Sequence, residues 1–130
     1  MNSYKELIRN AFKAVVENPT YDPTTIEKYF SRDYRQHVDG EELDFDNFCK
    51  HMKAQKLAIK YSLIDFQTMV EEGNIIFTNH AVKIQTNEDR HALIHVIAEF
   101  RVNDGKITYC NELTRLVSGD ERERDLGSRR

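Results

Sequence analysis

The stretch that decides the fold lies near the end of the chain: Asn103-Asp-Gly-Lys-Ile-Thr-Tyr-Cys-Asn-Glu-Leu-Thr-Arg-Leu116. Asp-Gly is a residue pair typical of tight β-hairpin turns, so Asp104-Gly105 predicts that one strand ends before it and another begins after it. Side chains along the second strand, residues 106–117, alternate between two faces. The middle of this strand carries Asn111 and Glu112 between residues that favour burial, and a carboxylate at such a position needs an explanation.

The strand before the turn, residues 91–102, has one purely apolar face and one mixed face. The apolar face is formed by Ala92, Ile94, Val96, Ala98, Phe100 and Val102. An apolar face of this kind packs against the core of a sheet protein. The hairpin therefore predicts a long antiparallel pair of strands that is buried on one side.

Two further strands precede this hairpin. Residues 58–70 alternate with a change of phase, which predicts a bulge near Ile64-Asp65. Residues 75–86 follow a turn at 72–74 and end at a turn at 87–89. Four strands in succession, joined by short turns, predict an antiparallel sheet.

The first 57 residues contain three predicted helices. Ser3 and Glu6 form a capping box before the apolar stripe of residues 7–16, and Asn18-Pro19 ends that helix. Asp22 with Pro23 starts a short second helix. After an extended segment (residues 32–38) and a turn at Asp39-Gly40, a third helix begins near Asp44; its inward residues are predicted to be Phe45, Phe48, Cys49 and Met52. Helices followed by a run of strands indicate an α+β fold.

Composition restricts the class of protein. The 130 residues fit one domain, which we place at residues 1–117, with a polar tail at residues 118–130. A net charge of -3 argues against a nucleic-acid or anionic-membrane partner, and no apolar run is long enough to span a bilayer. Cys49 and Cys110 lack zinc-site spacing and do not suggest a disulfide scaffold. With no secretory signal at the start, these features favour a cytoplasmic protein.

The order of these elements resembles the nuclear transport factor 2-like superfamily, and within it the SnoaL-like branch of polyketide cyclase relatives. Three stretches carry the resemblance: Tyr34-Arg-Gln-His37 with the following Gly40 and helix, Phe100-Arg-Val-Asn-Asp-Gly-Lys-Ile107, and Glu112-Leu-Thr-Arg-Leu-Val-Ser-Gly-Asp120 with residues 125–129. The resemblance implies a cone-shaped cup of three N-terminal helices inside a strongly curved, mostly antiparallel sheet, with cystatin-like topology. It does not supply a function, because this fold hosts many chemistries and also non-catalytic modules.

The resemblance suggests a role for Glu112. If the face with Cys110, Glu112 and Thr114 lines the cup, the carboxyl group is desolvated and its pKa rises, as suits a general acid or base. The alternative is a structural carboxylate that pairs with an arginine or caps a backbone group.

His37 is the second predicted catalytic residue, because the resemblance places it near the base of ketosteroid isomerase relatives. The alternative is a histidine that stabilises the following turn through Asp39 or the backbone. Phe12 and Ala98 stand about where that branch carries its tyrosine and protonated aspartate. The two missing oxyanion donors argue against ketosteroid isomerisation and leave a cyclase-type proton transfer open.

The remaining predicted ligand-binding residues form the cup lining with the two catalytic candidates. They are Phe12, Phe30, Tyr61, His80, Ala98, Phe100, Cys110 and Thr114. Cys110 reads as a small hydrophobe more than as a nucleophile. His80, His91 and His95 lack metal-ligand spacing, so we expect no metal, and we expect no cofactor.

The mixed face of the hairpin, with Leu93, Ile97, Tyr109 and Leu113, is apolar for a surface that faces water. Members of the superfamily commonly pair through this surface, so we predict a homodimer. Three functions remain open: an enzyme that transfers protons on a small, largely apolar ligand, a module that binds such a ligand without converting it, and an interaction dimer with a filled core.

Overall fold

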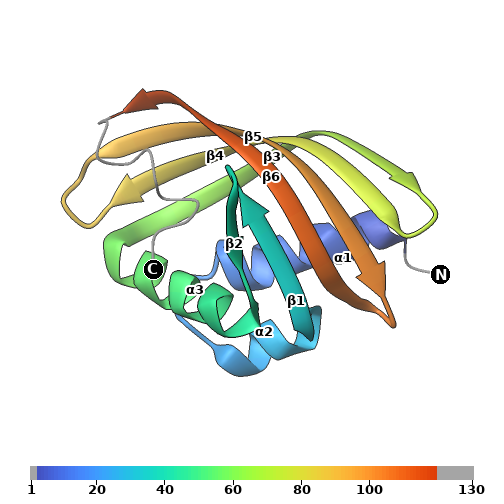
Figure 1. Cartoon of the computed structure of the whole chain (residues 1–130). Helices are drawn as coiled ribbons and strands as arrows, with labels where there is room; N and C mark the ends of the chain where they lie inside the picture. The colour runs from blue at the N-terminus through green and yellow to red at the C-terminus, as the bar shows by residue number, and fades with distance from the viewer. Residues whose placement is uncertain (1–2, 120–130) are drawn as a thin grey trace.

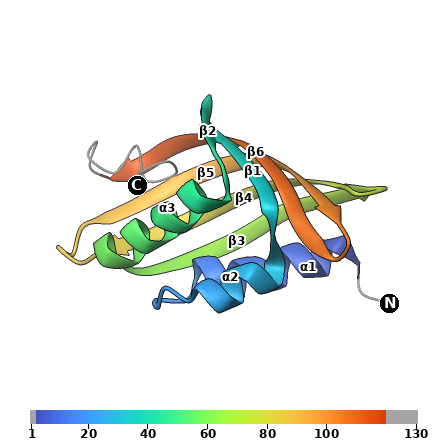
Figure 2. The ribbon, with the colours of Figure 1, turned by 60° about the horizontal axis from the view of Figure 1, so that its bottom comes forward.

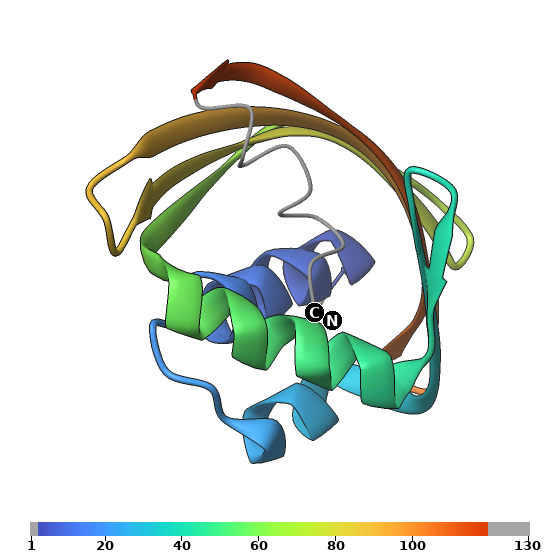
Figure 3. The same ribbon diagram turned by 60° about the vertical axis from the view of Figure 1, so that its left-hand side comes forward.

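The structure is a computed structural model that describes residues 3–119. Three helical segments cover the concave side of one strongly curved sheet (Figures 1 and 3). The elements are α1 (Tyr4–Ala11), η1 (Phe12–Val16), α2 (Pro23–Tyr29), β1 (Phe30–Val38), β2 (Glu41–Leu43), α3 (Phe45–Ala58), β3 (Ile59–Glu72), β4 (Ile75–Thr86), β5 (His91–Asn103) and β6 (Lys106–Gly119). This arrangement confirms the predicted α+β cup.

The helices begin where the sequence predicts. Ser3 Oγ accepts a hydrogen bond from the backbone N–H of Glu6 at 3.2 Å, and Asp22 caps α2 through the N–H groups of Thr24 and Thr25. Asp44 accepts from the N–H of Asn47 at 2.8 Å. Each cap satisfies donors that the first helical turn leaves unpaired. Residues 12–16 of the first predicted helix widen into the single π-turn η1, which ends at Val16, shortly before Asn18-Pro19.

The sheet has the strand order β2-β1-β6-β5-β4-β3, and Figure 2 shows α3 and the first helices under its hollow side. Neighbouring strands are antiparallel except β1 and β6, which run parallel. Phe100 pairs with Cys110 and Ala98 with Glu112 across β5 and β6. The six residues of the predicted apolar face, Ala92 to Val102, are each at most 6% exposed, which confirms that face as core.

Strand β3 differs from the prediction in its register. The register shifts between Ile59 and Tyr61 and again between Phe66 and Thr68, so no bulge lies at 64–65. Ser62, Ile64 and Phe66 lie inward, and Tyr61 and Leu63 are 47% and 51% exposed. On α3, Cys49 packs partly buried against the core as predicted, and His51, three residues after Phe48 on the same helical face, is buried as well.

The structure moves the boundary between the domain and the predicted tail. β6 continues through Ser118 and Gly119, which we had placed in the tail. The rest of the predicted tail, residues 120–130, lies outside the described residues. No helix within residues 3–119 has the length and hydrophobicity that a membrane span requires.

Candidate functional site

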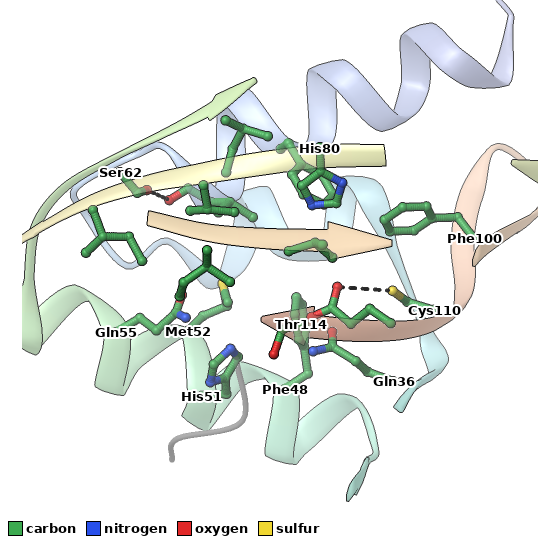
Figure 4. A pocket seen from close by; sticks show the side chains of 18 of the residues that line it. Gln36, Phe48, His51, Met52, Gln55, Ser62, His80, Phe100, Cys110 and Thr114 are labelled. Carbon is green, nitrogen blue, oxygen red and sulfur yellow. Dashed lines mark hydrogen bonds between the residues drawn. The ribbon is translucent and has the colours of Figure 1, made fainter. Parts of the chain in front are cut away.

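A cavity of about 100 Å³ lies between the helices and the hollow face of the sheet. Figure 4 shows labelled side chains from α3, β1, β3, β4, β5 and β6 around it. Ligand pockets commonly measure about 300–1,000 Å³. A cavity this small accommodates a ligand of few atoms and not a large polycyclic molecule.

Most of the cavity wall is apolar. Its apolar part consists of Phe12, Val16, Phe30, Phe48, Met52, Ile59, Ile64, Val82, Ile84, Ile94, Val96 and Phe100. The polar members are Tyr34, Gln36, His51, Gln55, Ser62, His80, Cys110, Glu112 and Thr114. Among the described lining residues there is one carboxylate and neither a lysine nor an arginine.

The pKa of Glu112 on the cavity wall is shifted close to neutral pH. Burial raises its pKa from the ordinary 4.5 to about 7, the charge of Asp39 adds to the rise, and a hydrogen bond from Cys110 Sγ at 3.8 Å opposes it. At neutral pH the carboxylic acid and the carboxylate are therefore both populated. A group in this state can give and take a proton without a large free-energy cost.

Asp39 ties the loop after β1 to the strand that carries Glu112. Its carboxylate accepts hydrogen bonds from the backbone N–H of Thr114 at 2.8 Å and from the Thr114 hydroxyl. The backbone N–H of Asp39 donates to the carbonyl of Glu112 at 3.0 Å. Asp39 adopts φ of 51°, a left-handed conformation that aspartate tolerates better than most residues. These bonds fix the backbone of β6 from the Glu112 carbonyl to Thr114.

His80 also lines the cavity, but it is held as a neutral group. Its Nδ1 lies 2.9 Å from Thr78 Oγ1, and its ring packs edge-on against Phe12 and at a tilt against Phe66. Burial lowers the pKa of His80 to about 4, with a smaller contribution from His95. The imidazole is therefore uncharged at neutral pH.

The predicted site residues fall into two groups. Phe12, Phe30, His80, Phe100, Cys110, Glu112 and Thr114 border the cavity together. Ala98 is 1% exposed and lies within the core of the inner face, but its methyl group is not part of the cavity wall.

Two predicted residues, His37 and Tyr61, point away from the cavity. On β1 the buried residues are Tyr34, Gln36 and Val38, so His37 points to the other side of the sheet, where its ring lies 5.6 Å from that of Tyr109. Tyr61 is 47% exposed because the first register shift of β3 turns it outward. Neither residue lines the cavity.

Several lining residues were missed by the sequence analysis. His51 and Gln55 continue the helical spacing of Phe48 and Met52 on α3, and this spacing was visible in the sequence. Tyr34 and Gln36 lie on the strand face that also carries Phe30 and Val38, whereas the residues between them are polar, so this alternation was visible in the sequence as well. Ser62 depended on the position of the β3 register shift.

No metal centre emerges from the geometry. Within residues 3–119 no group of three or more histidine, cysteine, aspartate or glutamate side chains is arranged to hold a metal ion. Cys110 is buried, and burial raises the pKa of its thiol well above the ordinary value.

Comparison with known proteins gives a family but no assigned activity. No protein-family model matches the sequence. The uncharacterized protein C11D3.04c of Schizosaccharomyces pombe is 35% identical over 124 residues, which cover 95% of each chain. This chain belongs to the family of that fission-yeast protein.

Solved structures place this family in the nuclear transport factor 2-like, SnoaL-like fold. IdmH of Streptomyces antibioticus, provisionally assigned as a polyketide cyclase, superimposes with a TM-score of 0.71 at 14% identity over 87% of this chain and 92% of its own. A Mycobacterium tuberculosis LEH-like epoxide hydrolase gives 0.68 at 16% identity over 85% and 84% of the two chains. An NTF2-like protein of unknown function from Cytophaga hutchinsonii gives 0.64 at 15% identity over 94% of each. At these identities the likeness establishes the fold.

Proposed function

We propose that this protein binds a small, largely apolar molecule in the cavity and that Glu112 exchanges a proton with it. The observation that carries the proposal is a carboxyl group with a pKa of about 7 on a wall that is otherwise mostly apolar. Perturbed carboxyl groups in hollows of this kind are typical of acid and base catalysts. The reaction is of the cyclase, isomerase or dehydratase type, in which a proton leaves one atom and returns to another.

The fold is compatible with such chemistry. An epoxide hydrolase and a protein with an assigned cyclase role share it, although a shared fold does not transfer an activity. Since His37 lies outside the cavity, it is not part of the proposed proton transfer, and Glu112 carries that role. The limited volume selects molecules of about the size of a five-membered ring with one or two substituents.

Exchange of carbon-bound hydrogen for deuterium tests the proposal without knowledge of the natural substrate. Cyclopentanone in D₂O at neutral pD should lose its α-protons faster with the protein than with Glu112→Gln, by about a hundredfold, the lower range of general base catalysis. Glu99→Gln is the matched control, because Glu99 is on the neighbouring strand and pairs with Arg101 at 2.8 Å. Equal rates for the wild type and Glu112→Gln would remove Glu112 from proton transfer.

The second candidate is a binding module that does not convert its ligand. Two polar contacts favour it: the Tyr34 hydroxyl donates to Gln36, and His80 Nδ1 is paired with Thr78, so both side chains are held in place by their neighbours. Saturable binding of cyclopentanone without any accelerated exchange would favour this function over catalysis.

We also propose that two copies pair through the outer sheet face. Ile97 and Leu113 are directly opposite each other on β5 and β6 and are 44% and 67% exposed, and Phe77 on β4 is 50% exposed. Adjacent exposed apolar side chains on a sheet are typical of an interface. Light scattering should give twice the chain mass, and Leu113→Lys should reduce it to one chain. A wild-type mass of one chain at micromolar concentration would reject the dimer.

A further inference from the structure

Two neighbouring side chains of β1 form a prearranged pair on the cavity wall. The Tyr34 hydroxyl donates to Gln36 Oε1 at 2.6 Å, and the two residues are 1% and 6% exposed. The parallel register places Gln36 beside Cys110 and Val38 beside Glu112. Figure 4 shows Gln36, Cys110 and Thr114 together on one side of the cavity. The pair therefore lies on the same side as the candidate proton-transfer group.

Tyr34 decides which end of the Gln36 amide remains available. The phenol uses the carbonyl oxygen, so the amide nitrogen is the free end. No residue between 3 and 119 accepts a hydrogen bond from Gln36 Nε2. A buried N–H group without an acceptor is unfavourable, and a ligand oxygen placed against it removes that cost.

The charges around the cavity restrict what can bind there. An anion would enter a space that contains a carboxyl group and, among the described lining residues, no lysine or arginine. Burial of a charge without a counter-charge is strongly unfavourable. A cation would be attracted by Glu112 when that group is ionised, but it would meet the donor end of Gln36 and would lose its hydration. An uncharged molecule avoids both penalties.

From this geometry we propose that the ligand is an uncharged carbonyl compound whose oxygen accepts a hydrogen bond from Gln36 Nε2. This inference rests on the proposed function, because it takes the cavity as the binding site and Glu112 as the proton carrier. The places of Phe12 and Ala98, where isomerase relatives were expected to carry oxyanion donors, hold none here. Gln36 supplies such a donor from a different strand.

The proton transfer is then balanced within the site. The C–H bond next to the carbonyl breaks and its proton goes to the Glu112 carboxylate. The electron pair forms the carbon–carbon double bond of an enolate, and the carbonyl π electrons move to the oxygen, where the Gln36 N–H group stabilises the new charge. Return of the proton to the same carbon gives the hydrogen exchange of a saturated ketone. In a β,γ-unsaturated ketone the enolate is conjugated with the second double bond, so return of the proton to the γ-carbon moves that double bond to the α,β position and completes an isomerisation.

Three ring compounds of similar size test the ligand class by titration of ¹⁵N-labelled protein at pH 7. Cyclopentanone should bind at least about tenfold more tightly than cyclopentylammonium or cyclopentanecarboxylate, and it should shift the side-chain NH₂ signals of Gln36. Gln36→Met should weaken ketone binding about tenfold, the effect of one lost hydrogen bond. Tyr34→Phe leaves the Gln36 amide in place but removes the hydrogen bond that orients it, so this variant should bind the ketone several-fold more weakly. Gln67→Met makes the same chemical change at an exposed position of β3 outside the cavity; it is the matched control and should bind like the wild type.

The outcomes separate the inference from the proposed function. Ketone binding that is unchanged in well-folded Gln36→Met and Tyr34→Phe, or preferential binding of either charged probe, overturns the carbonyl inference and leaves the cavity as a binding site. Binding by none of the three probes overturns both. If Gln36→Met does not fold, the Gln36 NH₂ shifts in the wild type and the affinity of Tyr34→Phe decide the result. Ketone binding with the expected shifts, but with exchange that is equal in Glu112→Gln, supports the inference and removes the proposed catalysis.

Discussion

Replacement of Glu112 by glutamine should change the pH dependence of stability in a defined direction. The folded protein raises the pKa of this carboxyl group from 4.5 to about 7, so between these values the folded state holds a proton that the unfolded chain has lost. Stability of the wild type therefore falls as pH rises through this window. Glutamine does not titrate, so the stability of the Glu112→Gln variant does not fall in this pH range for this reason.

The magnitude follows from the size of the pKa change. A difference of about 2.5 pH units corresponds to about 3 kcal/mol at about 1.4 kcal/mol per unit. Part of the Glu112 side chain remains accessible on the cavity wall, and solvent screening reduces the effect. We expect the free energy of unfolding of Glu112→Gln, relative to wild type, to rise by about 2 kcal/mol between pH 5 and pH 8.

Urea unfolding of both proteins at several pH values measures this difference directly. A carboxyl ¹³C titration of Glu112 gives the pKa of the folded state independently. Glu99→Gln again serves as the control, because Glu99 lies on the outer face beside Arg101. A stability difference that stays constant within about 0.5 kcal/mol from pH 5 to pH 8 would refute the reasoning, and with it the perturbed carboxyl group on which the proposed function depends.

Three further outcomes are expected. Asp39→Asn should lower the pKa of Glu112, because the Asp39 charge contributes to its rise; an unchanged ¹³C titration would contradict this. Lys56→Met should reduce the free energy of unfolding in urea by about 1–2 kcal/mol, because Lys56 Nζ donates to two backbone carbonyls at the end of η1, at 2.8 and 2.7 Å. Lys56→Arg is the control. Equal stability of the wild type and the Met variant would show that these bonds contribute nothing. His80→Phe should make the free energy of unfolding less sensitive to acid. Burial lowers the pKa of His80 from 6.5 to about 4, so the stability of the wild type should fall by about 2 kcal/mol relative to the variant as pH drops from 7.5 to 4.5. Parallel plots of stability against pH for the two proteins would disprove this.

The sequence determined the hairpin of β5 and β6 and the buried face of β5. Asp104-Gly105 set the turn, and the unbroken apolar alternation from Ala92 to Val102 left one choice of buried face. The inner position of Glu112 was not fixed in this way, because a regular hairpin would place Asn111 beside Ala98. The register shift next to Val102 adds one residue to β6 and brings Glu112 to that position instead. The helix starts were equally local, since Ser3, Asp22 and Asp44 cap through bonds within three residues.

The tertiary structure decided the faces of β3 and the polar contacts of β1. Phe30, Tyr34 and Val38 already indicate the buried face of β1, but the burial of Gln36 on that face depends on pairing with β6, about 75 residues away in sequence. In β3 the register shifts place Ser62 inside and Tyr61 outside. The orientation of the Gln36 amide follows from a buried hydrogen bond with Tyr34. Alternation and caps act over a few residues and can be read from the chain, whereas register shifts and the burial of a polar side chain depend on which distant segments pair with the strand and exclude water from it.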